Sequence, residues 1–392
     1  MRKAIFAAAV ALISAWALKP EPVLSHAVVN TTVNYDRDIS RIVRKRCLSC
    51  HSENNLGIPL TTYEETRPWS ASLKEEVLRR HMPPWRALRG YGTFANDAGL
   101  TSKEQAFLLA WIDGKGPKGT EHIVANVDQF KSAAEERLKL DPAWQLGKPD
   151  LLKVLTPTTV APGEGDIVRR VEIDLGLRSE RTIRALEFKP GDRRVVRAVT
   201  FTVRDSGQWL GSWTPWYPTM ALPADMGIQV PAGARVVAEI HYRSTDVPVD
   251  ERGSLALYFT SKAVIASPRS LVIDAAPAAA DAKSAPGSTK FGGSVRLASE
   301  TTLLAINPEV TASTRSFSLS ARQPNGAVRV LLLVRDALPE WPTPYVFTDP
   351  VRLPRGTELI LVQQLASGDG AGAPDRVRMT LSVVAAPTVD TH

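Results

Sequence analysis

The chain has few residues that bind metals or form cross-links, with two cysteines and six histidines among 392 residues. A structural zinc site needs four cysteine or histidine ligands. No second cluster supplies partners for Cys47 and Cys50, so this kind of site is excluded. The sequence also lacks a nucleophile elbow, a phosphate-binding loop and a calcium-binding loop. Beyond the N-terminus, no run is long and apolar enough to span a membrane.

The N-terminus has the pattern of a secretory signal peptide. Two basic residues precede an apolar run over residues 4–18, and Ala15-Trp16-Ala17 offers a small-x-small cleavage site. The run has about fifteen residues where a spanning helix needs ~20, so an uncleaved anchor is the less favoured alternative. We therefore expect a signal peptide over residues 1–27 and a mature chain in the periplasm without a transmembrane span.

Both cysteines lie in the run Cys47-Leu48-Ser49-Cys50-His51. Cys-x-x-Cys-His is the attachment pattern of haem c, in which each thiol adds to a haem vinyl group and the histidine becomes an axial iron ligand. A disulfide is the ordinary expectation for two cysteines in an exported protein. A thioredoxin-like redox pair follows a strand, and no strand pattern precedes Cys47. The motif predicts one covalent haem c, anchored by Cys47 and Cys50 and ligated by His51.

The flanking sequence has helical periodicity in the stretches that begin at Asn34, Trp69 and Thr101. In the second stretch Trp69, Leu73 and Val77 form one apolar stripe, and the third begins with a capping box at Thr101 and Glu104. Helix, haem motif, loop, helix, methionine, helix is the order of a small cytochrome c. We therefore predict an all-α monohaem cytochrome c domain over residues 28–120.

The second axial ligand is expected within the run Arg-Arg-His-Met-Pro-Pro, where Met82 is the predicted ligand. The prolines that follow hold the segment in an extended conformation, which suits a thioether that must stay against iron. His81 is the competitor and would give a bis-histidine haem of lower potential. A haem sensor or peroxidase-like site with an open coordination position is a third possibility.

Four further motifs follow the haem motif along the chain: Pro-Leu-x-x-Tyr-Glu, Met-Pro-Pro-Trp, Tyr-Gly-x-Phe-x-Asn-Asp and Ala-Trp-Ile-Asp. With them, residues 35–119 resemble the cytochrome c module of bacterial proteins in which that module is fused to a copper type II, ascorbate-dependent monooxygenase-like domain, related to peptidylglycine hydroxylating monooxygenase. The resemblance implies that a proline carbonyl accepts the Nδ1–H of the axial histidine, and Pro59 stands where that proline is expected. It continues through the second half and implies two jelly-roll-like sandwiches, with one copper ligated from each.

Beyond Leu151 the apolar period changes from helical to two, in short runs separated by turn formers, which is typical of antiparallel sandwiches. Phe317, Leu319 and Ala321 alternate without interruption and are expected to point inward. The predicted fold class is multidomain α plus β, an all-α cytochrome c domain followed by two antiparallel β-sandwich lobes. The expected divisions after the cytochrome domain are a connector over 121–150 with a short helix, lobe 1 over 151–273, an Ala/Pro-rich linker over 274–290 and lobe 2 over 291–392.

Copper binding is not expected, because two type II copper sites need about five imidazoles and a thioether. After residue 123 the chain has only His241 and His392. The resemblance implies three groups of copper ligands that this chain has largely replaced. Paired histidines are expected where it has Arg197 and Ala198. A His-x-His motif is expected at His241-Tyr242-Arg243, and a Pro-His-Met-His motif is expected at Pro308-Glu309-Val310-Thr311. The remaining His241 is interpreted as structural, and Glu309 is a candidate ion-pair partner for Arg197 or Arg243.

Two function classes follow. The favoured one is an exported c-type cytochrome that transfers electrons, with a copper-free β region as scaffold or docking surface. The alternative is a haem-fused copper monooxygenase-like oxidoreductase acting on an unknown substrate. The formal net charge of +7 and an extracytoplasmic location do not suggest nucleic-acid binding. The expected partner is a redox protein.

Basic residues on both sides of the haem motif could steer an acidic partner, and solvated helix faces are the alternative. They are Arg41, Arg44, Lys45, Arg46, Arg79 and Arg80. Trp209, Trp213 and Trp216 are interpreted as packing at a sandwich rim rather than as a binding surface.

Overall fold

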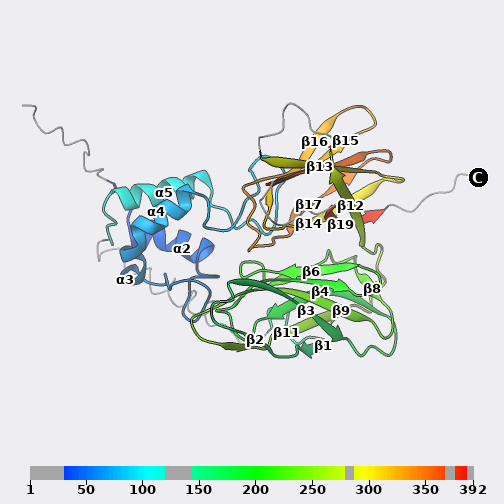
Figure 1. Ribbon diagram of the computed structural model, residues 1–392, viewed down its shortest axis with the longest axis horizontal. Helices are drawn as coiled ribbons and strands as arrows, with labels where there is room; N and C mark the ends of the chain where they lie inside the picture. Colours follow the sequence, from blue (N-terminus) through cyan, green and yellow to red (C-terminus); the bar gives the residue numbers. More distant parts are fainter. Residues whose placement is uncertain (1–30, 120–143, 279–286, 367–375, 386–392) are drawn as a thin grey trace, which may run out of the picture.

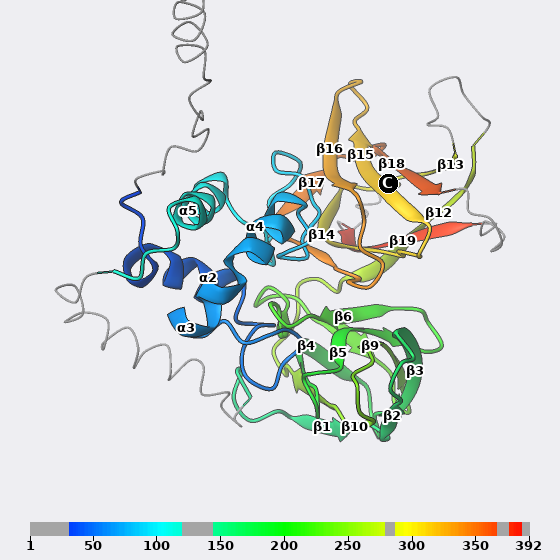
Figure 2. The same ribbon diagram turned by 60° about the vertical axis from the view of Figure 1, so that its left-hand side comes forward.

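The computed structural model describes residues 31–119, 144–278, 287–366 and 376–385. The predicted signal peptide and the predicted connector helix lie outside these residues. The described chain is mainly β and has three parts: a helical part and two β lobes that follow it in sequence (Figure 1). When the molecule is turned, the helices still lie beside the two lobes and do not cover a sheet face (Figure 2).

The helical elements are short, and three of them begin at side-chain caps. Asn34 accepts from the Arg37 amide, and capping boxes start the helices after Thr62 and Thr101, as the sequence predicts for Thr101. Trp69 does not belong to a buried stripe, because it is 46% exposed. The elements are the π-helix η1 (Tyr35–Ile39), α2 (Ser40–Arg46), α3 (Tyr63–Thr66), the 3₁₀-helix η2 (Arg67–Trp69), α4 (Ser70–Leu78) and α5 (Ser102–Asp113).

The prediction of an all-α N-terminal domain is wrong, and so is the fold class that contained it. Between α4 and α5 the chain leaves the helices and joins the second β lobe. Ala87 and Phe94 form antiparallel bridges with Val334 and Phe347, and Trp85 is buried in the same core. The apolar side chains of this segment lack a helical period, and they are buried against the strands of lobe 2.

Lobe 1 contains the strands from β1 to β11. A four-stranded sheet in the order β3-β9-β5-β6 faces a five-stranded sheet, β1-β11-β4-β7 with β8 beside β4, while β2 and β10 form a separate pair. Phe188 from one sheet contacts Phe201 and Trp213 from the other. The strands are β1 (Leu151–Val154), β2 (Thr158–Val160), β3 (Asp166–Asp174), β4 (Arg181–Lys189), β5 (Val196–Val203), β6 (Trp209–Trp213), β7 (Thr219–Ala221), β8 (Ile228–Val230), β9 (Arg235–Arg243), β10 (Val249–Glu251) and β11 (Ser254–Phe259).

Lobe 2 contains eight strands in one antiparallel sheet, in the order β16-β15-β18-β13-β12-β19-β14-β17. The pairs Ala276–Gly292 and Pro277–Phe291 join its two halves, which enclose one core. Phe317, Leu319 and Ala321 point into that core, as predicted. The strands are β12 (Arg269–Pro277), β13 (Ser288–Arg296), β14 (Thr301–Pro308), β15 (Thr314–Arg322), β16 (Val328–Arg335), β17 (Tyr345–Leu353), β18 (Glu358–Ala366) and β19 (Val377–Ala385).

The boundary between the lobes differs from the prediction. β12 begins at Arg269 and pairs with β13 and β19, so lobe 2 starts before residue 274. The described ends of the predicted linker over 274–290 belong to β12 and β13. Within the described ranges, no helix has the length and apolar character that crossing a membrane requires.

Candidate functional site

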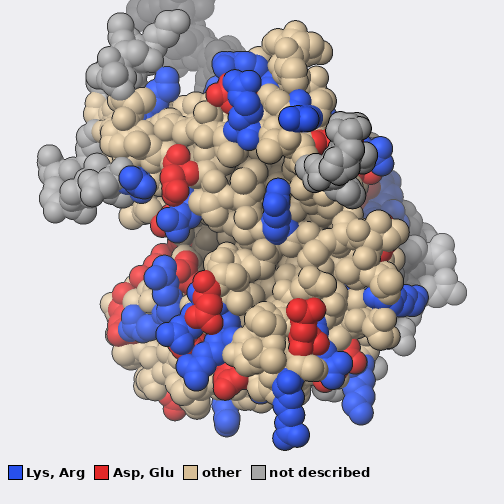
Figure 3. All heavy atoms as spheres, turned by 90° about the vertical axis from the view of Figure 1, so that its right-hand side faces the viewer, with Lys and Arg blue, Asp and Glu red and all other residues tan. Residues whose placement is uncertain are grey.

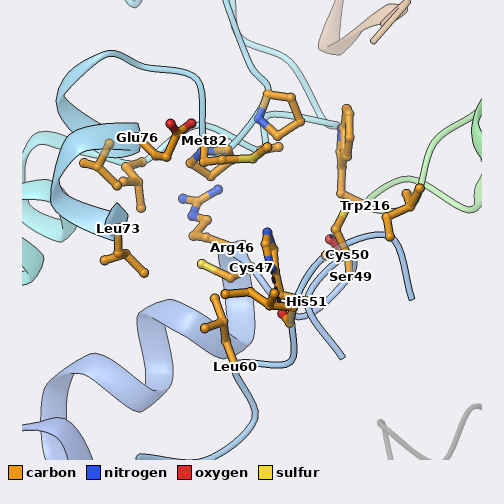
Figure 4. A pocket seen from close by; sticks show the side chains of 18 of the residues that line it. Arg46, Cys47, Ser49, Cys50, His51, Leu60, Leu73, Glu76, Met82 and Trp216 are labelled. Atoms are coloured by element: carbon orange, nitrogen blue, oxygen red, sulfur yellow. Dashed lines mark hydrogen bonds between the residues drawn. The ribbon is translucent and has the colours of Figure 1, made fainter. Parts of the chain in front are cut away.

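A mostly apolar pocket lies where the helical part meets both lobes (Figure 4). Its enclosed cavity measures about 200 Å³, and the empty space reaches about 1080 Å³ when the open solvent at its mouth is included. Lobe 1 contributes Trp216 and Arg243 to the wall, and lobe 2 contributes Trp341. Four of the five predicted site residues line it: Cys47, Cys50, His51 and Met82.

Cys47 and Cys50 are free thiols in the turn that follows α2. The amides of Cys50 and His51 donate to the Cys47 carbonyl at 3.0 and 2.9 Å, so one backbone turn holds the whole motif. Burial raises the pKa of each thiol to about 12. Because the thiolate is the reactive form in disulfide exchange, this burial argues against the redox-pair alternative.

The His51 ring is fixed by a hydrogen bond from Nδ1 to the Ile58 carbonyl oxygen at 2.9 Å. A carbonyl oxygen can only accept, so Nδ1 carries the proton and Nε2 keeps the lone pair that a metal requires. Burial lowers the pKa of His51, and the bond to Ile58 opposes that shift. The neutral ring, which is the form that binds a metal, is therefore favoured.

The prediction that Pro59 supplies this carbonyl is wrong by one residue, since the acceptor belongs to Ile58. Pro59 is exposed and does not line the pocket. Because Pro59 directly follows Ile58, the sequence pattern located the accepting carbonyl to within one residue. Gly57 lies against the His51 ring, with no room for a Cβ atom.

Met82 enters the pocket from the side opposite His51 (Figure 4). It follows the end of α4, where the amides of His81 and Met82 both donate to the Glu76 carbonyl, at 2.9 and 3.3 Å. The His81 side chain instead lies on the surface, with Nδ1 3.4 Å from Glu76 Oε2. Of the two candidate axial ligands, Met82 lines the pocket that also contains His51, and His81 does not.

The residues of this pocket fit a haem attached through thioethers. An imidazole with a free Nε2 and a thioether lie on opposite sides of an apolar space, and two unpaired thiols lie on its wall. Aliphatic side chains provide the remaining surface that a porphyrin would contact. They include Leu56, Leu60, Leu73, Val77, Leu100 and Leu108.

The two lobes close the pocket on the side of Cys50. Cys50, Leu56 and Trp341 form one buried cluster, and Trp216 packs against it with its ring centroid 5.6 Å from that of Trp341. Arg243 of β9 donates to the Leu56 carbonyl at 2.8 Å. Sequence patterns did not identify Trp341 or Gly57 as site residues, since neither belongs to a periodic run or a motif.

Trp216 therefore lines the pocket, whereas Trp209 and Trp213 are buried in the lobe 1 core, as the packing interpretation predicts.

Arg197 and His241 lie on the neighbouring strands β5 and β9, beside a register shift in their pairing. The Arg197 guanidinium lies 5.3 Å from the Trp341 ring centroid, and its Nη1 is 2.9 Å from Asp166 Oδ2 without the alignment of a hydrogen bond. Glu309 is not the partner that the sequence suggested, because Asp166 takes that place. Within the described ranges, no group of three or more His, Cys, Asp or Glu side chains could hold a metal ion.

His241 pairs with a carboxylate, and this pair gives a pH prediction. Its Nε2 lies 3.5 Å from Glu239 Oε1, and Arg170 lies 2.8 Å from Oε2. The His241 hydrogen bond, with Arg170, lowers the Glu239 pKa to about 2 against the opposing effect of burial. A lowered carboxyl pKa stabilises the fold above the unfolded value near 4.5, and this contribution disappears as the pH falls toward 2.

We expect Glu239→Gln to lower the free energy of unfolding by ~1 kcal/mol at pH 6 and by less than half as much at pH 3. Urea unfolding at both pH values measures the difference. Glu300→Gln, at an exposed residue between β13 and β14, is the control and should leave the free energy of unfolding unchanged at both pH values. Equal losses at pH 6 and pH 3 would contradict the assignment.

No protein-family model and no curated protein matches the chain. Among solved structures, it is similar to the major capsid protein P2 from bacteriophage PM2, with 10% identity over 61% of this chain and 99% of that one and a TM-score of 0.24. It is also similar to the mavirus major capsid protein, with 6% identity over 63% and 89% of the two chains and a TM-score of 0.19. TM-scores this low do not indicate a shared overall fold, so no functional argument rests on them.

Proposed function

We propose that this protein is an exported monohaem c-type cytochrome that transfers electrons, with β lobes that act as scaffold or docking surface. The observation that supports this most strongly is the placement of His51 and Met82 on opposite sides of one apolar pocket that also holds two free thiols. The sequence resemblance to cytochrome c modules fused to monooxygenase-like domains supports the same proposal.

In this proposal Cys47 and Cys50 would anchor the haem through thioethers, and His51 Nε2 and Met82 Sδ would be its iron ligands. When bound, haem c supplies one site that is reversibly oxidised and reduced by a single electron. The Ile58 carbonyl holds the imidazole in the correct tautomer, and the leucines of the pocket exclude water. Trp341 and Trp216 extend that exclusion to the side of Cys50, so the lobes take part in building the site.

A redox protein is the proposed partner, and its acidic character is supported by the basic residues around the haem motif. Several of these charges are partly balanced within the chain. Arg46 Nη2 lies 3.1 Å from Glu104, Lys45 lies 3.8 Å from the same carboxylate, and Arg79 lies 2.8 Å from Glu75. On the face of lobe 1 away from the helices, acidic and basic side chains are interspersed (Figure 3). That face therefore offers no uniformly basic surface to an acidic partner.

The decisive experiment is an optical spectrum with metal analysis on the full chain, produced in cells that attach haem c. We expect one covalent haem per chain, no stoichiometric copper and a low-spin spectrum. One or two coppers per chain would overturn the copper-free proposal, and absence of covalent haem would overturn the proposal as a whole.

Met82→Ala tests the sixth ligand. The thioether would be lost while both cysteines and His51 remain, so we expect a high-spin spectrum and carbon monoxide binding without displacement of a protein ligand. Met226→Ala is the matched control, because Met226 lies in lobe 1 and does not line the pocket. A low-spin spectrum in Met82→Ala that disappears in His81→Ala would assign the ligand to His81.

A further inference from the structure

The loop that holds the His51 ring is itself held from lobe 1. Arg243 is the last residue of β9, and its Nη1 donates to the Leu56 carbonyl at 2.8 Å. The backbone of Arg243 is fixed in lobe 1, because its amide donates to the Val195 carbonyl at 2.8 Å and its strand pairs with both β3 and β5. The guanidinium therefore reaches the helical part from a rigid support.

The loop over residues 56–58 contacts the ring twice. Gly57 lies against the ring with no room for a Cβ atom, and the Ile58 carbonyl accepts the Nδ1 hydrogen bond at 2.9 Å. The haem motif holds one point of this loop, since the Gly57 amide donates to the Cys50 carbonyl at 2.9 Å. Beyond that point Ile58 and Pro59 are exposed, and a proline has no amide proton to donate. The bond from lobe 1 therefore adds a constraint to a loop that has few of its own.

The Arg243 guanidinium has no competing carboxylate. Asp166, its partner in the register of β3 and β9, lies against Arg197 instead, and Glu239 on the same strand pairs with Arg170. In the ranges that the structure describes, no Asp or Glu side chain forms an ion pair with Arg243. A charged donor makes a stronger hydrogen bond than a neutral one, so the carbonyl that it contacts is firmly held.

We propose that Arg243 is a positioning residue for His51, which it orients through the loop over residues 56–58. By holding the Leu56 carbonyl, it keeps the Ile58 carbonyl within hydrogen-bonding distance of Nδ1, so that Nε2 stays without a proton. Such a bond also raises the basicity of an imidazole that binds a metal. The role of His51 as an iron ligand rests on the proposed function, whereas the orientation of its ring does not. Lobe 1 then sets the orientation of a side chain that it does not itself contain.

Nitrogen-15 chemical shifts of the ring, measured on the full chain without haem, report the tautomer of His51. Well above the ordinary histidine pKa of ~6.5, we expect the parent ring to carry its proton on Nδ1. Arg243→Met removes the donor and loosens the loop, so a large part of the population should move to the Nε2–H form. Arg243→Lys keeps a charged donor and should restore part of the Nδ1–H form. The His51 signals are assigned by comparison with His51→Gln.

Arg235→Met is the matched control. Arg235 lies at the opposite end of β9, where its side chain makes an exposed ion pair with Glu172, and its loss should leave the tautomer unchanged. A lower Tm with an unchanged tautomer in Arg243→Met would make Arg243 a docking contact only and would overturn the inference. An equal change of tautomer in Arg235→Met would also overturn it. Arg243→Ala, which lacks the donor as well, replaces the methionine variant if that variant does not fold.

In the haem protein, the reduction potential reports the same hydrogen bond. A more basic imidazole stabilises the oxidised iron, so Arg243→Met should raise the potential, and Arg243→Lys should bring it back toward the parent value. An unchanged potential in Arg243→Met would overturn the role of Arg243 at the haem site. Failure to obtain a haem protein would count against the proposed function alone, because the tautomer is measured without haem.

Discussion

Gly57→Ala is expected to displace the His51 ring and, if the proposed haem is bound, to remove most of its low-spin signal. The added Cβ would overlap Cε1 and Nδ1 of the ring and would lie 3.0 Å from Cγ. The ring must then move, and the Nδ1 hydrogen bond to Ile58 would be lost. The Gly57 backbone is not left-handed, so alanine adds no conformational strain of its own. Optical spectra and the rate of carbon monoxide binding measure the loss of the axial ligand.

The cysteines should still hold the haem in Gly57→Ala, so denaturing gels stained for haem should show an unchanged covalent yield. Gly292→Ala is the matched control. Its new Cβ would meet only the Ala278 Cβ, at 4.0 Å, and its backbone is also not left-handed. A Gly57→Ala protein with an unchanged low-spin spectrum would show that His51 does not occupy this position when haem is bound.

Local sequence patterns correctly predicted features that depend on neighbouring residues, such as the buried side of a strand and the start of a helix. Alternation over residues 316–321 identified the buried side of β15, and the capping box at Thr101 and Glu104 identified the start of α5. The haem motif placed three site residues together because they lie within one backbone turn. The composition of the segment around Met82 made it the predicted second ligand, and the structure places Met82 in the wall of the same pocket.

Contacts between distant segments could not be predicted in this way. The segment around Trp85 and Phe94 contains prolines, glycines and aromatic residues without a period, and it is buried only because lobe 2 offers complementary strands. Trp341 reaches the Cys50 side of the pocket through the arrangement of whole lobes. The helical spacing of the N-terminal stretches therefore suggested an independent all-α domain, although part of its apolar surface belongs to a β core.

Asn96→Ala is expected to lower the free energy of unfolding by about 3 kcal/mol, because it removes two buried side-chain hydrogen bonds between that segment and lobe 2. The Asn96 side chain is 3% exposed, donates to the Pro344 carbonyl at 2.6 Å and accepts from the Val346 amide at 3.1 Å. Alanine would leave both backbone groups without partners, and each unsatisfied buried group costs about 1–3 kcal/mol. Urea unfolding followed by tryptophan fluorescence measures the loss.

Asn325→Ala is the matched control. The Asn325 side chain lies in an exposed turn and accepts one hydrogen bond, from the Ala327 amide at 3.0 Å. Loss of this bond should cost no more than ~1 kcal/mol. Asn96→Asp adds a second test, because a carboxylate still accepts from Val346 but would face the Pro344 carbonyl without a proton to donate. At neutral pH it should be at least as destabilising as alanine. If Asn96→Ala and Asn325→Ala cost the same, the segment is not anchored through Asn96.

If the predicted loss is observed in the haem protein and methionine ligation weakens at lower urea than global unfolding, then lobe 2 also supports the position of Met82.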